Sequence, residues 1–156
     1  MKFIKNLSIA SYVNLASTIL ILASMILTII SSSFLGYEIS QLGLIIGFSI
    51  VAAICLLGSI ALSLKFGNHF VSYIPMLVAA VLSGVCFYFV INSRTYLIGT
   101  VWATSLDRTN EYAVGAMGTG GPAFIIYCAT MIVIAAGSFF NLTKEVKVES
   151  AEVIAE

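Results

Sequence analysis

Four long stretches without a charged side chain divide this chain, and each is long enough to cross a membrane. They cover residues 6–37, 39–64, 66–93 and 112–143. A transmembrane helix needs roughly 20 consecutive, mostly apolar residues. The chain is 60% hydrophobic and 9% charged, whereas soluble domains carry about 25% charged residues. The sequence therefore predicts an all-α membrane protein, a bundle of four transmembrane helices.

We place the spans at about residues 11–31, 42–64, 71–91 and 122–141. Helices are expected because lipid offers the backbone no hydrogen-bond partner, and because the alternation of transmembrane β-strands is missing from these runs. Residues 1–142 would form one transmembrane domain, and residues 143–156 a short cytoplasmic tail. Residues 92–121, between the third and fourth spans, are predicted to be a long segment outside the membrane.

Basic residues in short loops set the predicted orientation, because they favour the cytoplasmic side. One side of the predicted topology carries five of them and the other side two: Lys2, Lys5, Lys65, Lys144 and Lys147 against Arg94 and Arg108. This asymmetry predicts that both termini are cytoplasmic. We expect the protein in the plasma membrane, with residues 92–121 on the outside.

The outer segment is the best candidate for a partner-binding surface. Its first half is too apolar for a free loop, so it either continues the third helix or lies flat on the membrane. The predicted partner-binding residues are Tyr96, Leu97, Val101, Trp102, Asp107, Arg108 and Glu111. The glycine-rich run that follows, residues 115–121, is expected to be a flexible lead-in, with Pro122 in the first turn of the fourth helix.

Small residues spaced four apart are candidates for helix packing, because they let backbones approach closely in lipid. Gly43 and Gly47 form a GxxxG motif in the second span, and Ala80 and Gly84 form a similar pair in the third. Packing within one bundle is favoured over a dimer face, although a homo-oligomer stays open.

The first span carries an unusual polar face, on which Ser11, Asn14, Thr18 and Thr28 recur at helical spacing. The favoured interpretation of Asn14 is a hydrogen bond between helices or solvation near the membrane surface. The alternative is that this face lines a pore.

No catalytic, metal or cofactor motif occurs in the sequence. The predicted spans contain no Asp, Glu, Lys, Arg or His, which disfavours a proton-coupled carrier, and the single His disfavours a catalytic zinc site.

Three cysteines fall inside predicted spans and are expected to be packing residues: Cys55, Cys86 and Cys128. Seven basic and seven acidic residues form no basic patch, so nucleic acid is not an expected partner.

These observations favour a non-enzymatic, multi-pass accessory or structural subunit of a larger membrane complex, such as a transporter. Its expected partners are the lipid bilayer and other membrane subunits. The alternative is a homo-oligomeric pore or carrier for a small neutral solute, lined by the polar face of the first span.

Overall fold

The computed structural model describes residues 9–66, 70–104 and 109–140. This part of the chain contains no strand, and four of its helices are long and apolar enough to cross a membrane. They are α2 (Ile9–Ser32), α3 (Leu42–Phe66), α4 (Ile74–Leu97) and α5 (Glu111–Gly137). The prediction of an all-α protein with four membrane-length helices is confirmed. The predicted tail, residues 143–156, lies outside the described residues.

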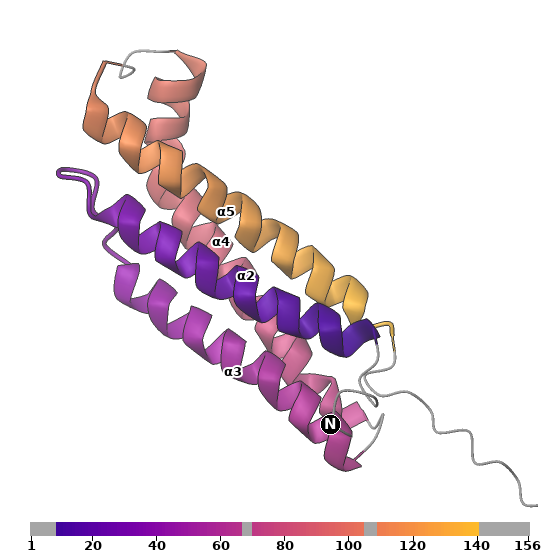
Figure 1. Cartoon of the computed structure of the whole chain (residues 1–156). Helices are drawn as coiled ribbons and strands as arrows, with labels where there is room; N and C mark the ends of the chain where they lie inside the picture. Colours follow the sequence, from indigo (N-terminus) through magenta and orange to yellow (C-terminus); the bar gives the residue numbers. More distant parts are fainter. Residues whose placement is uncertain (1–8, 67–69, 105–108, 141–156) are drawn as a thin grey trace, which may run out of the picture.

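The four helices form one bundle in which each packs beside its neighbours in the chain (Figure 1). The last helix, α5, packs against α2 as well as α4, so it closes the bundle next to the first helix. Consecutive helices run antiparallel, in the up-down-up-down order of bundles with short connections. The 24 residues of α2 span about 36 Å, enough for a hydrocarbon core of about 30 Å.

The connection from α2 to α3 turns sharply at Gly36. This residue has φ of 81°, a left-handed conformation that glycine adopts without steric cost. The Ser32 hydroxyl accepts a hydrogen bond from the Ile39 N–H at 2.9 Å, which holds the connection against the end of α2. The connection from α3 to α4 includes η1, a short 3₁₀ helix over Phe70–Ser72.

The third helix extends further than the span predicted for it. Pro75 lies in the first turn of α4, where its missing N–H is tolerated. After Leu97 the chain continues into η2, a π-helical segment over Ile98–Ala103. The residues after the predicted end of the span, 92–103, are therefore helical. Of the two alternatives for this segment, continuation of the third helix is the one observed.

The glycine-rich run is also helical, and the prediction of a flexible lead-in is wrong. Residues 115–121 lie inside α5, and Pro122 lies in the helix interior rather than in its first turn. Asn110 caps the helix, because its side-chain oxygen accepts hydrogen bonds from the N–H groups of Tyr112 (3.1 Å) and Ala113 (3.4 Å). Glycine disfavours a helix locally, but it lets α5 approach its neighbours closely, and that packing outweighs the propensity.

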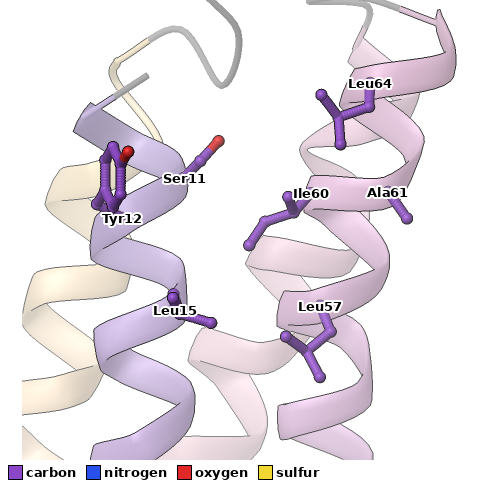
Figure 2. Close-up of a pocket in the computed structure, with 7 residues that line it drawn as sticks. All are labelled: Ser11, Tyr12, Leu15, Leu57, Ile60, Ala61 and Leu64. Carbon is purple, nitrogen blue, oxygen red and sulfur yellow. The ribbon is translucent and has the colours of Figure 1, made fainter. Parts of the chain in front are cut away.

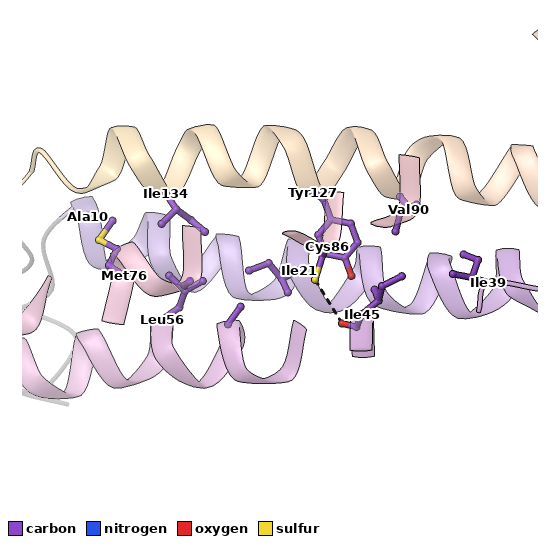
Figure 3. Close-up of a cluster of buried hydrophobic side chains, with 13 residues drawn as sticks. Ala10, Ile21, Ile39, Ile45, Leu56, Met76, Cys86, Val90, Tyr127 and Ile134 are labelled. Carbon is purple, nitrogen blue, oxygen red and sulfur yellow. Dashed lines mark hydrogen bonds between the residues drawn. The ribbon is translucent and has the colours of Figure 1, made fainter. Parts of the chain in front are cut away.

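Two apolar clusters form the core. The larger cluster runs along most of the bundle and takes side chains from all four helices, including Ile21, Leu56, Cys86 and Tyr127 (Figure 3). The smaller cluster lies where α4 and η2 meet the start of α5 and consists of Leu97, Val101, Ala113, Ala116 and Met117. Phe34 and Tyr37, from the α2–α3 connection, pack against it.

Candidate functional site

The apolar residues predicted to bind a partner divide into buried and exposed ones. Leu97 and Val101 belong to the smaller cluster, and only 2% and 6% of their surfaces are exposed. Tyr96 (69%) and Trp102 (51%) remain exposed at the same end of the bundle. The chain itself therefore covers Leu97 and Val101, and Tyr96 and Trp102 are the apolar residues left for a partner.

The charged residues predicted to bind a partner are only partly visible. Glu111 is exposed in the first turn of α5. Asp107 and Arg108 lie outside the described residues. Partner binding by this group stays a prediction.

Arg94 is a basic side chain buried inside the bundle, with 2% of its surface exposed. Its Nε donates a hydrogen bond to the Ser31 hydroxyl (3.0 Å), and its Nη2 donates to the Ser31 carbonyl (2.7 Å). Its Nη1 donates to the Tyr37 carbonyl (2.7 Å). The sequence prediction placed Arg94 outside the third span, but the longer helix brings it inside the candidate span Phe70–Ala103.

Ser31 connects three helices at this point. Its hydroxyl oxygen accepts the hydrogen bond from Arg94 of α4 and donates its own proton to the Ala116 carbonyl of α5 at 2.6 Å. One hydroxyl at the end of α2 thus joins α4 to α5. The Ser31 side chain therefore accepts a hydrogen bond from the Arg94 guanidinium and also holds the glycine-rich half of α5 against α2.

The charge of Arg94 is balanced by backbone oxygens. Ser31 lies in the last turn of α2, where carbonyl groups have no partner within the helix. The macrodipole of the helix places about half a negative charge at this end. The acidic side chains among the described residues, Glu38 and Glu111, are both exposed. Among the described residues, the partial negative charge at the end of α2 therefore balances the positive charge of Arg94.

Gly120 of α5 provides the space for this network. A Cβ atom at Gly120 would lie 2.7 Å from the Ser31 hydroxyl oxygen and 3.2 Å from Arg94 Nε. The neighbouring Gly121 faces Trp102 in the same way, because a Cβ there would lie 3.1 Å from the indole ring. Both glycines are buried, so the glycine-rich run serves close packing.

Arg94 lies in register with the other buried residues of α4, as the burial pattern of the structure shows. The buried residues of α4 recur at steps of three and four: Met76, Ala79, Ser83, Cys86, Val90, Arg94 and Leu97. Such a repeat marks the side of a helix that faces the core. Arg94 was predicted to lie outside the span because it is the first charged residue after the third apolar stretch.

A second group of polar contacts lies where α3, α4 and α5 meet. The hydroxyl groups of Ser49 and Tyr127 share a hydrogen bond of 2.7 Å, and the Cys86 sulfur lies 3.6 Å from the Ser49 oxygen. The Cys86 thiol also donates to the Ile45 carbonyl at 3.7 Å (Figure 3). All three side chains are buried, so these contacts satisfy polar groups that lipid could not.

The polar face of α2 points into the bundle. Asn14 and Thr18 are buried, and the Asn14 Nδ2 group donates to the Ser59 hydroxyl at 3.0 Å. A weaker contact of 3.7 Å joins Nδ2 to the Met76 sulfur. Of the two environments favoured for Asn14, a hydrogen bond between helices and solvation near the membrane surface, the hydrogen bond is the one observed. Because the chain's own helices enclose this face, it is not available to line a pore between copies.

The two small-residue pairs have different surroundings. A Cβ atom at Gly84 would lie 2.9 Å from the Met131 sulfur of α5, and Ala80 packs against the larger cluster. Gly43 and Gly47 are exposed on α3, and a Cβ at either position would meet no atom within 4 Å. The α4 pair lies at a helix contact, whereas the α3 pair faces no other helix in the part of the chain that the structure describes.

Neither a metal site nor a relative identifies the protein. Within residues 9–66, 70–104 and 109–140, no three His, Cys, Asp or Glu side chains come together as a metal ion would require. No family model, curated protein or solved structure matches the chain. Its function has to be argued from the surfaces and contacts described above.

Proposed function

We propose that this chain is a non-enzymatic accessory subunit of a larger complex in the cell membrane, such as a transporter, and that it docks through the outward face of α3. The observation that carries the proposal is the GxxxG motif of Gly43 and Gly47, at which an added Cβ would meet no atom of the described residues within 4 Å. Each glycine costs a helix about 0.5–1 kcal/mol relative to alanine. In membranes, such motifs offset that cost by letting a second helix approach closely.

The rest of this face has the composition of a contact between transmembrane helices. Gly43, Gly47, Ile50 and Ile54 follow at steps of four, three and four, and all are exposed. Exposed Leu44 lies beside the glycines. Two glycines flanked by large apolar side chains form a shallow notch, into which a ridge of another helix can pack.

Aromatic residues at the predicted outer end offer a second contact to the same partner. Tyr96 and Trp102 project from α4 and η2, which follow α3 in the bundle. Tyr and Trp are enriched both at the membrane interface and at the centres of protein interfaces. A partner that covers these two residues as well as the α3 notch would contact the chain at two places, on neighbouring helices.

Extraction from the native membrane in a mild detergent, followed by native mass spectrometry, tests the proposal. We expect the wild type to co-purify with other polypeptides at a fixed stoichiometry. The double variant Gly43→Leu, Gly47→Leu should lose them, because its side chains prevent close approach. It should still fold, since an added Cβ at either position is clear of the other described residues. Ala136→Leu adds bulk at an exposed position of α5 and should keep the partner.

The other outcomes exclude parts of the proposal. A pure homo-oligomer that the double variant dissociates would show that α3 contacts a second copy, and the accessory role would be wrong. A complex that survives the double variant would show that α3 is not the docking face. A monomer extracted from the native membrane would contradict both statements.

A further inference from the structure

A groove separates the first turns of α2 from the last turns of α3, at the end of the bundle opposite Arg94. Its volume is about 340 Å³. Leu15 of α2 and Leu57, Ile60 and Leu64 of α3 line it, and Leu15 and Ile60 point into the gap between the two helices (Figure 2). Such a volume lies within the range of small-ligand sites in proteins.

The groove lies on the outside of a closed interior contact. Asn14 and Ser59, next to the wall residues in sequence, are buried and join α2 to α3 by a hydrogen bond of 3.0 Å. Leu15 and Leu57, by contrast, are exposed. The two helices are thus tied together on their inner side and separated on their outer side. The groove therefore opens sideways, toward whatever surrounds the bundle.

Lipid surrounds the bundle at this depth, because both walls belong to helices of membrane-crossing length and composition. The lining is almost entirely carbon, which suits an acyl chain and no polar solute. A flexible acyl chain can follow the groove along both helices, and its headgroup would then lie where α2 begins and α3 ends.

One end of the groove is polar. Tyr12 lines it near the start of α2, and Lys65 follows the wall residue Leu64 in the last turn of α3. Both side chains are exposed. A phenol and an ammonium group beside an apolar groove match a phospholipid, whose anionic headgroup lies next to its acyl chains. Basic pockets between transmembrane helices on the cytoplasmic side bind anionic headgroups, and this end is the predicted cytoplasmic one.

We propose that the groove between α2 and α3 binds one acyl chain of an anionic phospholipid, whose headgroup contacts Tyr12 and Lys65. The groove residue Leu57 lies one turn after Ile54 of the docking face, but Gly43 and Gly47, which the docking test replaces, lie at the other end of α3. The lipid would fill the outer separation between α2 and α3 and stabilise that side of the bundle. Binding and partner docking can therefore fail independently.

Native mass spectrometry of the full chain in mild detergent tests the site, with phosphatidylglycerol and phosphatidylcholine of the same acyl chains as probes. We expect one phosphatidylglycerol to be retained per chain. Ala61→Phe should weaken its retention at least about tenfold, because the ring displaces several methylene groups from the groove. Lys65→Gln should weaken it about fivefold and abolish the preference over phosphatidylcholine.

Matched variants separate this site from general lipid association. Ala136→Phe places the same ring on an exposed face of α5, outside the groove, and should retain the lipid. If Ala61→Phe does not fold, Leu57→Trp fills the same groove from another position. Equal retention of both lipids by all variants would show annular lipid only and overturn the proposal. A groove that holds a second copy or another polypeptide in native extracts, in place of lipid, would overturn it as well.

Discussion

Arg94 donates two hydrogen bonds to one residue, Ser31: one to its hydroxyl group at 3.0 Å and one to its carbonyl group at 2.7 Å. The carbonyl belongs to the last turn of α2, where the helix supplies no donor of its own. Arg94 of α4 thus donates a hydrogen bond to a carbonyl oxygen that has no partner within α2. A charge that would be costly in lipid becomes a link between helices.

Replacing Arg94 should destabilise the protein more than replacing any exposed charge. Arg94→Met leaves three acceptors without their donor, on Ser31 and Tyr37, and we expect a loss of about 3 kcal/mol in the free energy of unfolding. Arg94→Lys keeps the charge but lacks the planar guanidinium group. It should therefore lower the free energy of unfolding by less than Arg94→Met does. Denaturation in detergent, followed by circular dichroism, measures both. Glu111→Gln, at an exposed position, should change stability by less than about 1 kcal/mol, and an equal loss there would contradict the prediction.

Two glycines of α5 offer a matched comparison of packing against helix propensity. A Cβ at Gly120 would crowd Ser31 and Arg94, whereas a Cβ at Gly118 would meet no atom within 4 Å. Gly120→Ala should therefore cost about 1–3 kcal/mol. Gly118→Ala should stabilise the helix by about 0.5–1 kcal/mol. The two melting temperatures, measured in the same detergent, should move in opposite directions. A rise for both would mean that the Arg94 network is looser than the structure has it.

The number of helices was predicted correctly from the sequence. Lipid requires an uncharged stretch of about 20 residues for each span, and such a stretch is visible without knowing how the helices pack. The bounds of α2 and α3 are close to the predicted spans for the same reason. The start of α5 was missed by eleven residues, Glu111 against Pro122. Local propensity disfavours a glycine-rich helix there, and packing against Ser31 and Trp102, together with the Asn110 cap, stabilises that helix.

The candidate sites were less accessible to prediction because they depend on which way a residue faces. Gly43 and Gly47 carry the same motif whether they contact a neighbouring helix or face lipid, and spacing alone does not separate the two. Arg94 required the true length of α4 before its place on the buried stripe became visible. Asn14 was predicted correctly as a packing residue, since a lone amide in an apolar helix has few other stable environments.

The contact between Asn14 and Ser59 predicts two unequal single substitutions. Nδ2 of Asn14 donates to Ser59, but Oδ1 finds no donor among the described residues. Ser59→Ala leaves both ends of a buried amide poorly satisfied and should cost about 1–2 kcal/mol. Asn14→Leu removes the amide altogether and should cost less or stabilise the protein. In a double-mutant cycle, the coupling energy should be about 0.6 kcal/mol, and a zero coupling would show that the hydrogen bond does not form.

The predicted orientation is open to a direct test with engineered cysteines at the two ends of the bundle. Ser40, in the α2–α3 connection, and Phe70, at the start of η1, are both exposed and lie at opposite ends. In a background without the three natural cysteines, Ser40→Cys should react with a membrane-impermeant maleimide on intact cells. Phe70→Cys should react only after permeabilisation.

The physical reason is that Lys65 precedes η1, with Lys2, Lys5, Lys144 and Lys147 predicted on the same side. The burial of Arg94 strengthens this asymmetry, because its charge is already held inside the bundle. The reversed labelling pattern would show that the termini lie outside, and the acyl-chain groove would then face the outer leaflet.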